Sequence, residues 1–154
     1  PPPDPPPGTM PGLLEAEDAP SFFDTDMINE GGVYRSDGLD VEACAVCLRT
    51  GSAGYSVGWT APGEWLQFPV TFATSGSYKV RVRYTTPDTG QAVRVRMNGV
   101  DITGQIALPQ TGGWGNWQDV TSAAFSANAG ATTIRVELLS DLFNLDMIEV
   151  IPAN

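Results

Sequence analysis

The sequence predicts an all-β protein: a β-sandwich of the jelly-roll type with about nine short antiparallel strands and no substantial helix. Two observations carry this prediction. Residues 77–86 and 91–98 alternate between apolar and charged or polar side chains, which is the period of a strand with one buried face. Turn-forming residues separate such segments, and no segment keeps the 3.6-residue period of a helix.

The composition limits the class of partner. The 154 residues suffice for one domain with a hydrophobic core, and 17 glycines and 13 prolines suit a protein with many turns. A formal net charge of −10 disfavours nucleic acid, because its phosphates require neutralising cations. No apolar stretch is long enough to cross a membrane. We expect a monomer that binds neither nucleic acid nor membranes.

The chain divides into two parts. Residues 1–12 are rich in proline and glycine, which favours an extended, semi-rigid linker to a neighbouring domain. Residues 13–152 hold the predicted sandwich, and residues 19–53 within it are polar and loop-like. Strands are expected at residues 13–18, 55–59, 64–72, 77–86, 91–98, 102–108, 117–125, 132–139 and 146–151.

The only cysteines are Cys44 and Cys47, in the run Cys-Ala-Val-Cys. A thioredoxin-like motif would need a βαβ context, and a zinc site would need more Cys or His ligands than the sequence has. We therefore favour a local disulfide over two free buried thiols. Disulfides are typical of oxidising compartments, which favours a secreted protein.

Two carboxylates, Glu15 and Glu17, share one face of the first predicted strand. They repel each other unless a cation lies between them or water surrounds both, and the residues alone leave both interpretations open. An acid–base pair for glycoside hydrolysis would need carboxylates across a cleft. The absence of His excludes nucleophilic triads of the Ser-His type. We expect no enzymatic activity.

Two tryptophans lie in the glycine-rich run Thr-Gly-Gly-Trp-Gly-Asn-Trp at residues 111–117. Glycine-rich backbone is typical of a loop. If a strand follows, Trp117 points into the core and Trp114 stays exposed on the loop. An exposed indole is a flat apolar platform on which a sugar ring can stack. The alternative is that both rings belong to the core.

A set of motifs follows one another along residues 13–152. They are Leu-Glu-Ala-Glu-Asp at 14–18, Gly-Trp-Thr-Ala-Pro-Gly-Glu-Trp-Leu-Gln-Phe at 58–68, Ser-Gly-Ser-Tyr-Lys-Val at 75–80, Leu-Pro-Gln-Thr-Gly-Gly-Trp-Gly-Asn-Trp at 108–117 and Phe-Asn-Leu-Asp at 143–146. In this order and spacing the chain resembles a family 6 carbohydrate-binding module. The resemblance implies a non-catalytic jelly roll covalently attached to a secreted polysaccharide-degrading enzyme.

The resemblance also implies a sugar-binding cleft at the loop end of the sandwich. Two aromatic rings would hold one sugar between them, and an asparagine would hydrogen-bond it. The matching positions are Trp59, Trp114 and Asn144, with Trp59 where the family often has tyrosine. We therefore expect the chain to bind a polysaccharide at or near a chain end.

An insertion at residues 31–54 offers further wall residues for this cleft, Tyr34, Asp37 and Asp40. Their Tyr-Arg-Ser-Asp run resembles modules attached to agarases. The expected ligand is therefore agarose or a β-1,3-glucan. The alternatives are xylan, cellulose or a sulfated glycan, or a calcium-stabilised adhesion or structural β-sandwich.

A structural calcium ion is a further implication of the resemblance. The family commonly binds Ca²⁺ through the Glu-x-Glu strand and an aspartate of the last strand, which correspond to Glu15, Glu17 and Asp146. Hard carboxylate oxygens at short spacing suit this ion.

Two further groups of side chains are given structural roles. We expect Trp65 and Trp117 to belong to the core, although a residue near Trp65 can line a second cleft in the family. A group of cations would form a basic stripe on adjacent strands, either a solvated face or a contact for a sulfated glycan. It consists of Lys79, Arg81, Arg83, Arg94 and Arg96.

Overall fold

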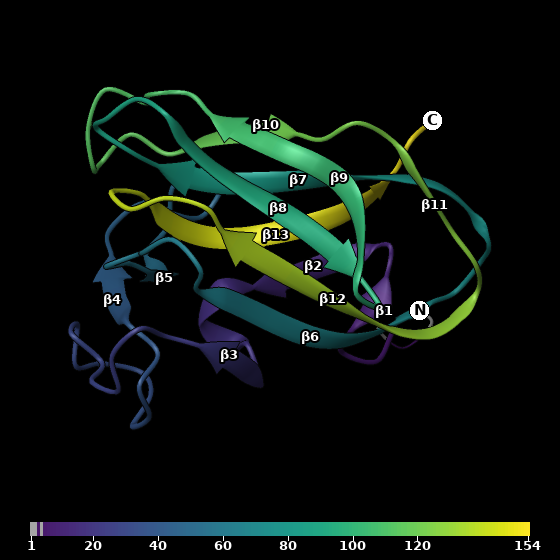
Figure 1. The fold of residues 1–154 in the computed structure, drawn as a ribbon, viewed down its shortest axis with the longest axis horizontal. Helices are drawn as coiled ribbons and strands as arrows, with labels where there is room; N and C mark the ends of the chain where they lie inside the picture. Colours follow the sequence, from purple (N-terminus) through teal and green to yellow (C-terminus); the bar gives the residue numbers. More distant parts are fainter. Residues whose placement is uncertain (1–2, 4) are drawn as a thin grey trace.

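The computed structural model describes residues 3 and 5–154 and forms two β-sheets packed face to face (Figure 1). Sheet A contains β1 (Thr9–Met10), β3 (Ser21–Phe23), β6 (Trp65–Phe72), β8 (Gln91–Met97), β9 (Val100–Leu108) and β12 (Gly130–Leu138). Sheet B contains β2 (Gly12–Glu15), β4 (Val41–Cys44), β5 (Gly54–Val57), β7 (Gly76–Thr85), β10 (Gln118–Thr121), β11 (Phe125–Ala127) and β13 (Asn144–Pro152). A single 3-10 turn, η1 (Ala16–Asp18), is the only helix among the described residues.

The strand order confirms the predicted all-β sandwich. Sheet A runs β1-β6-β12-β8-β9 and sheet B runs β10-β7-β13-β5-β4, with β3, β11 and β2 paired alongside β6, β7 and β13. Strands β12 and β13, consecutive in the chain, lie in different sheets, as do β7 and β8. The loops that join such strands cross from one sheet to the other and gather at the ends of the sandwich (Figure 1).

The described residues contain more strands than the predicted about nine. The additional strands β1, β3 and β4 have two to four residues each, too few for an alternating pattern to be recognised. The strand predicted at residues 117–125 is divided into β10 and β11. At the division, the Ser122 hydroxyl accepts a hydrogen bond from the Val80 N–H at 2.9 Å, in place of a backbone carbonyl.

Residues 9–12 belong to the sandwich and not to the predicted linker. Met10 is completely buried, and β1 pairs in parallel with β6. The carbonyl oxygens of Gly8 and Met10 accept hydrogen bonds from the N–H groups of Thr71 and Ala73. Proline removes backbone donors but leaves these acceptors, so a proline-rich segment can pair with a sheet edge. Residues 1, 2 and 4 of the predicted linker lie outside the described residues.

The core lies between the sheets and follows the predicted alternation. Strand β7 buries Val80, Val82 and Tyr84, while strand β8 buries Val93 and Val95. Strand β6 and strand β12 supply the facing apolar side chains of sheet A. None of the helices that the structure describes has the length and apolar character needed to cross a membrane.

Neither Trp65 nor Trp117 belongs to this core, so both predictions were wrong. Trp65 is partly buried on the outer face of sheet A, because the next residue, Leu66, is the one that faces inward. The guanidinium of Arg135 lies 3.8 Å from the centroid of the Trp65 ring. Trp117 is partly buried in the loop before β10, outside the buried cluster.

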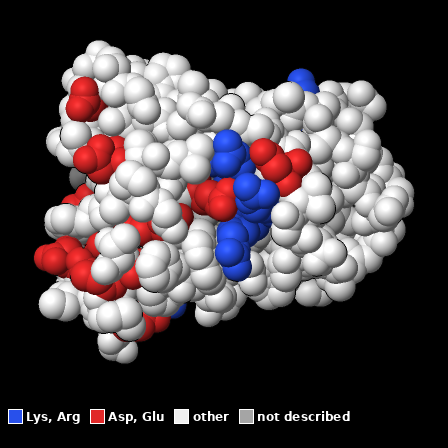
Figure 2. Space-filling model, viewed as in Figure 1, with Lys and Arg blue, Asp and Glu red and all other residues white. Residues whose placement is uncertain are grey.

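The predicted basic stripe does not form, because β7 and β8 are in different sheets. Four arginines of the predicted stripe are paired with acids on strands of their own sheet: Arg81 with Glu149, Arg83 with Asp119, Arg94 with Asp101 and Arg96 with Glu137. Figure 2 shows cations at the centre of one face with acidic side chains directly against them. These faces offer little net charge to a sulfated glycan.

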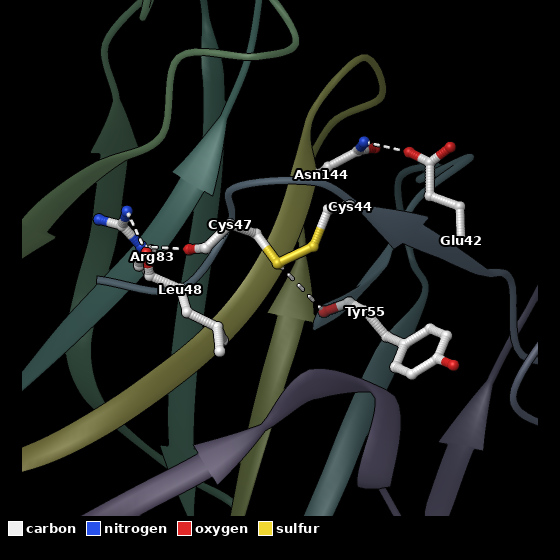
Figure 3. Close-up of a disulfide and its surroundings, with 7 residues drawn as sticks. All are labelled: Glu42, Cys44, Cys47, Leu48, Tyr55, Arg83 and Asn144. Atoms are coloured by element: carbon white, nitrogen blue, oxygen red, sulfur yellow. Dashed lines mark hydrogen bonds between the residues drawn. A yellow bond between two sulfur atoms is a disulfide. The ribbon is translucent and has the colours of Figure 1, made fainter. Parts of the chain in front are cut away.

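Cys44 and Cys47 form the predicted disulfide, at the end of β4 (Figure 3). The loop between β4 and β5 is also tied to sheet B. Arg83 on β7 donates to the carbonyl oxygens of Cys47 and Leu48. Arg49 from the loop pairs with Asp119 and Glu149. The loop is therefore fixed over the outer face of sheet B.

Replacing both cysteines, Cys44→Ser with Cys47→Ser, should lower the free energy of unfolding by about 2 kcal/mol, the chain-entropy value for so short a loop. Urea denaturation measures this change. A reductant should destabilise the wild type by the same amount and leave the double variant unaffected. A reductant effect that persists in the double variant would contradict the prediction.

Candidate functional site

A cleft of about 630 Å³ opens at one end of the sandwich, where loops from both sheets meet. Its lining comes from the β3–β4 loop, strand β4, the β5–β6 loop, the β9–β10 loop and the segment that leads into β13. The lining residues are Asp26, Glu30, Glu42, Trp59, Thr60, Trp114, Asp141, Leu142, Phe143 and Asn144. The structure therefore brings Trp59, Trp114 and Asn144, which are far apart in the sequence, to one site.

The two indoles of the cleft are exposed to solvent: Trp59 by 49% and Trp114 by 46%. Exposure of a large apolar ring to water is unfavourable, so two half-exposed indoles that line one cleft indicate a surface for a ligand. Trp59 also has φ of +46° and its cleft neighbour Leu142 has φ of +58°. Bulky residues rarely adopt this left-handed conformation, and such strain concentrates at functional sites.

The loop that carries Trp114 is fixed from below by buried threonines. Gly112 and Gly113 have φ of +93° and +153°, which allows the sharp turn. The Thr85 hydroxyl on β7 lies 2.6 Å from the Gly113 carbonyl oxygen and 2.9 Å from that of Asn116. The Thr111 N–H donates to the Thr86 carbonyl at 2.9 Å. These contacts hold a glycine-rich loop in one shape.

The loop that carries Trp59 is tied to its neighbours in the same way. The Thr60 hydroxyl donates to the Phe143 carbonyl at 3.1 Å, which joins the β5–β6 and β12–β13 loops. The buried Glu64 carboxylate accepts from the N–H groups of Ala61 and Thr25 and from the Thr25 hydroxyl. These hydrogen bonds therefore join three loops of the cleft.

Asn144 and Glu42 form the polar side of the cleft. The Asn144 side-chain amide donates to a carboxylate oxygen of Glu42 (Figure 3). Asn144 is the first residue of β13 and Glu42 is on β4. Gly58 allows this approach, because a Cβ there would lie 2.9 Å from the Asn144 Oδ1. Glu42 was missed as a site residue, because β4 has only four residues and is too short for its alternating pattern to be recognised.

The three predicted wall residues of the insertion do not line the cleft. Tyr34 packs on Tyr55, with ring centroids 4.6 Å apart, and donates its hydroxyl to Asp18. Asp37 forms a two-point ion pair with Arg35. Arg35 also donates to the backbone carbonyls of Glu17 and Ala19. The Tyr34–Asp37 run therefore fastens the insertion onto η1.

Asp40 is buried below the cleft instead of lining it, and accepts a hydrogen bond from the Glu30 N–H at 2.7 Å. It lies near the buried Asp24 and Glu64. Burial and the neighbouring carboxylates raise the pKa of Asp24 to about 7 and that of Asp40 to about 6. Asp24, Asp40 and Glu64 form a buried acidic group beneath the β3–β4 loop.

Because the pKa of Asp24 is raised in the folded state from 3.8 to about 7, the folded protein holds this proton more tightly than the unfolded chain. The free energy of unfolding should therefore fall as the pH rises from the unfolded pKa of 3.8 to the folded pKa of about 7. Asp24→Asn keeps the oxygen that accepts the Asp26 N–H and should remove that loss. We expect a gain of about 1 kcal/mol at pH 8, or roughly 2–4 °C in Tm, and none at pH 4.

Scanning calorimetry at pH 4 and pH 8 measures the Tm of the wild type and of the Asp24→Asn variant. Asp88→Asn, at an exposed loop position, serves as the control. An equal gain at both pH values would show that the pKa of Asp24 is not responsible.

A second group of carboxylates, Glu15, Glu17 and Asp146, lies apart from the cleft. One oxygen from each of the three side chains lies within 4.8 Å of the other two. One oxygen of each glutamate and both oxygens of Asp146 are buried without a hydrogen-bond partner. Burial, with the neighbouring carboxylates, raises the pKa of Glu17 to about 8 and that of Asp146 to about 7. Unpaired buried oxygens at this spacing fit a hard divalent cation such as Ca²⁺.

The sequence profile described as "Carbohydrate binding module (family 6)" matches residues 35–152. The chain belongs to this family. The module resembles the family 6 module of Cellvibrio mixtus lichenase 5A in complex with cellotriose, with 25% identity and a TM-score of 0.71 over 92% of this chain and 97% of that one. It also resembles the C-terminal family 6 module of LamC, a marine laminarinase of Zobellia galactanivorans, with 25% identity and a TM-score of 0.70 over 90% and 97%.

Curated relatives are longer proteins. An isomaltosyltransferase of Sporosarcina globispora is 29% identical over 96 residues, which is 59% of this chain and 9% of the relative. The clotting factor G alpha subunit of Tachypleus tridentatus is 24% identical over 140 residues, which is 90% of this chain and 18% of the relative. The module therefore spans less than a fifth of each relative.

Proposed function

We propose that this module is non-catalytic, binds a polysaccharide in the cleft and targets an attached glycoside hydrolase to that polysaccharide. The observation that carries the proposal is the meeting of two half-exposed indoles, Trp59 and Trp114, with the Asn144–Glu42 pair in one cleft. Sugars have apolar C–H faces and polar edges. The indoles suit the faces, and the amide and carboxylate suit the hydroxyls.

The expected affinity is modest. Shielding about 60 Å² of apolar surface per indole at ~25 cal/mol/Å² gives roughly 1.5 kcal/mol per ring. Two rings and a few hydrogen bonds, less the cost of association, correspond to a dissociation constant on the order of micromolar to millimolar. Such affinity is useful in a tethered module, because a linker keeps the effective concentration high.

The proposed ligand is a β-1,3-glucan, with agarose as the second candidate. Support for the β-1,3-glucan comes from the neighbour that belongs to a laminarinase. The neighbour in complex with cellotriose, a β-1,4-glucan, keeps cello-oligosaccharides among the ligands to be tested. The loop between β3 and β4 places Asp26 and Glu30 beside the indoles and supports binding at or near a chain end. The proline-rich start of the chain suits a tether, and the disulfide suits secretion.

The decisive test is Trp114→Ala. Loss of one ring should weaken oligosaccharide binding by about tenfold or more. Stability should change by less than about 0.5 kcal/mol, because the ring is half-exposed on a loop. Calorimetric titration with laminari-, agaro-, cello- and xylo-oligosaccharides measures the affinity and identifies the ligand.

Trp65→Ala is the matched control, because Trp65 lies on the outer face of sheet A and not in the cleft. The Trp65→Ala variant should bind the oligosaccharide with the same affinity as the wild type. Binding that survives Trp114→Ala and is lost in Trp65→Ala would place the site on the sheet face and refute the proposed cleft.

We also propose that Glu15, Glu17 and Asp146 hold a structural Ca²⁺. The four unpartnered buried oxygens support this assignment. A bound ion would neutralise the carboxylates and fasten β13 to β2 and η1. Calcium at about a hundredfold excess over its dissociation constant should raise the free energy of unfolding by roughly 2–3 kcal/mol.

Thermal unfolding with calcium and with a chelator measures this gain. Asp146→Asn should lose most of the calcium response, while Asp101→Asn, a carboxylate on the outer face of sheet A, should keep it. An unfolding curve of the wild type that is the same with calcium and chelator would exclude the ion.

A further inference from the structure

We propose that the cleft selects glycans by charge and prefers β-glycans of cationic amino sugars over their neutral counterparts, while it rejects acidic sugars. This inference rests on the proposed function, since it assigns a ligand class to the same cleft. It begins from the side chains around the two indoles, four of which are carboxylates: Asp26, Glu30, Glu42 and Asp141.

These carboxylates reach the cleft from three different parts of the chain. Asp26 and Glu30 come from the β3–β4 loop, Glu42 from β4 and Asp141 from the β12–β13 loop. Asp26, Glu30 and Asp141 are exposed, so their charges stay in contact with the cleft. A sugar held between Trp59 and Trp114 would therefore lie in a cleft whose charged side chains are all carboxylates.

No lysine or arginine lines the cleft within the described part of the chain. The arginines that pair with carboxylates do so elsewhere: Arg35 with Asp37, and Arg49, Arg81, Arg83, Arg94 and Arg96 with acids on the sheet faces. In Figure 2 the acidic side chains gather toward one end of the molecule, away from the cations at the centre of the face. The negative charge of the cleft is therefore not neutralised by the protein.

Further acidic side chains are buried below the cleft. The buried Asp24, Asp40 and Glu64 lie under the β3–β4 loop, and the raised pKa values of Asp24 and Asp40 are caused first by burial and in part by neighbouring carboxylates. None of these three groups is a cation, so they do not offset the negative charge of the carboxylates that line the cleft. Such an enclosure raises the local concentration of cations and lowers that of anions.

An amino sugar matches this environment in two ways. Its ammonium group can donate charge-assisted hydrogen bonds to carboxylates, which are stronger than those of a hydroxyl. It can also lie over an indole face, where a cation is attracted by the ring. A uronic acid or sulfated sugar of the same shape would instead place its charge against the carboxylates.

The test compares three β-1,4-linked trisaccharides of one shape: cellotriose, its 2-amino counterpart built of glucosamine, and its uronic acid counterpart. Calorimetric titration is made at low salt, with the same calcium concentration throughout and at a pH where the amines are charged. The glucosamine trisaccharide should bind about tenfold tighter than cellotriose, and the uronic acid trisaccharide should bind more weakly than both. Added salt should shrink these ratios.

Two matched double variants locate the effect. Glu30→Gln with Asp141→Asn removes two charges from the cleft and should bring the ratio of glucosamine trisaccharide to cellotriose affinity close to one. Asp101→Asn with Glu137→Gln removes two charges from the outer face of sheet A and should leave the ratio unchanged. Fully N-acetylated chitotriose, which carries no charge, should show no salt dependence.

The outcomes separate charge selection from the proposed function. Equal affinities for the three trisaccharides, all lost in Trp114→Ala, would overturn charge selection and leave the binding cleft intact. Binding of the glucosamine trisaccharide that survives Trp114→Ala would show attraction to the surface in general and overturn the proposal. If no glycan binds at all, both proposals fall.

Discussion

The bulge in strand β13 is the constraint on which both candidate sites depend. Its pairing with β7 shifts between Leu145 and Met147, so that two residues stand between the core-facing Leu145 and Ile148 where a regular strand has one. Asn144, on one side of the bulge, reaches the cleft. Asp146, inside the bulge, reaches the carboxylate group with Glu15 and Glu17. One irregularity in one strand therefore separates the direction of the Asn144 amide, which lines the cleft, from that of the buried Asp146 carboxylate.

The burial of Asp146 depends on the disulfide loop as well as on the bulge. The sulfur atoms of Cys44 and Cys47 lie within 4.8 Å of an Asp146 oxygen. The same loop begins at β4, which carries Glu42 into the cleft (Figure 3). Removal of the disulfide would expose one site and loosen a wall of the other, so the stability of the loop and the shape of the cleft are coupled.

The sequence was informative where residues obey a local rule. Alternation identified the inward side chains of β7 and β8, and the resemblance to family 6 modules assigned Trp59, Trp114 and Asn144 to one cleft. Alternation separates the two faces of a strand but does not say to which sheet the strand belongs. The basic stripe failed for that reason, because β7 and β8 are consecutive in the chain and lie in opposite sheets.

The insertion was unpredictable for a different reason. Tyr34 and Asp37 were assigned to the cleft because they lie in the insertion, in a run that resembles agarase modules. Their positions depend instead on contacts with η1 and Tyr55, which are distant in sequence. Glu42 was missed because β4 is only four residues long. Loop residues obey no period, so their partners become visible only when the chain is folded.

The distribution of charge gives the acidic composition a physical meaning. A net charge of −10 spread evenly would act mainly on solubility. Here the cations are concentrated on the sheet faces, where Asp101, Asp119, Glu137 and Glu149 pair with them. Most of the other carboxylates that the structure describes lie at the cleft and in the two buried groups, while Asp18, Asp37 and Asp88 lie elsewhere. Ion pairing on the sheet faces therefore leaves those surfaces close to neutral and concentrates the unbalanced negative charge where a ligand would enter. A uniformly acidic surface would repel an anionic polysaccharide at every point. With this arrangement of charges, anions are repelled, and cations attracted, mainly at the cleft.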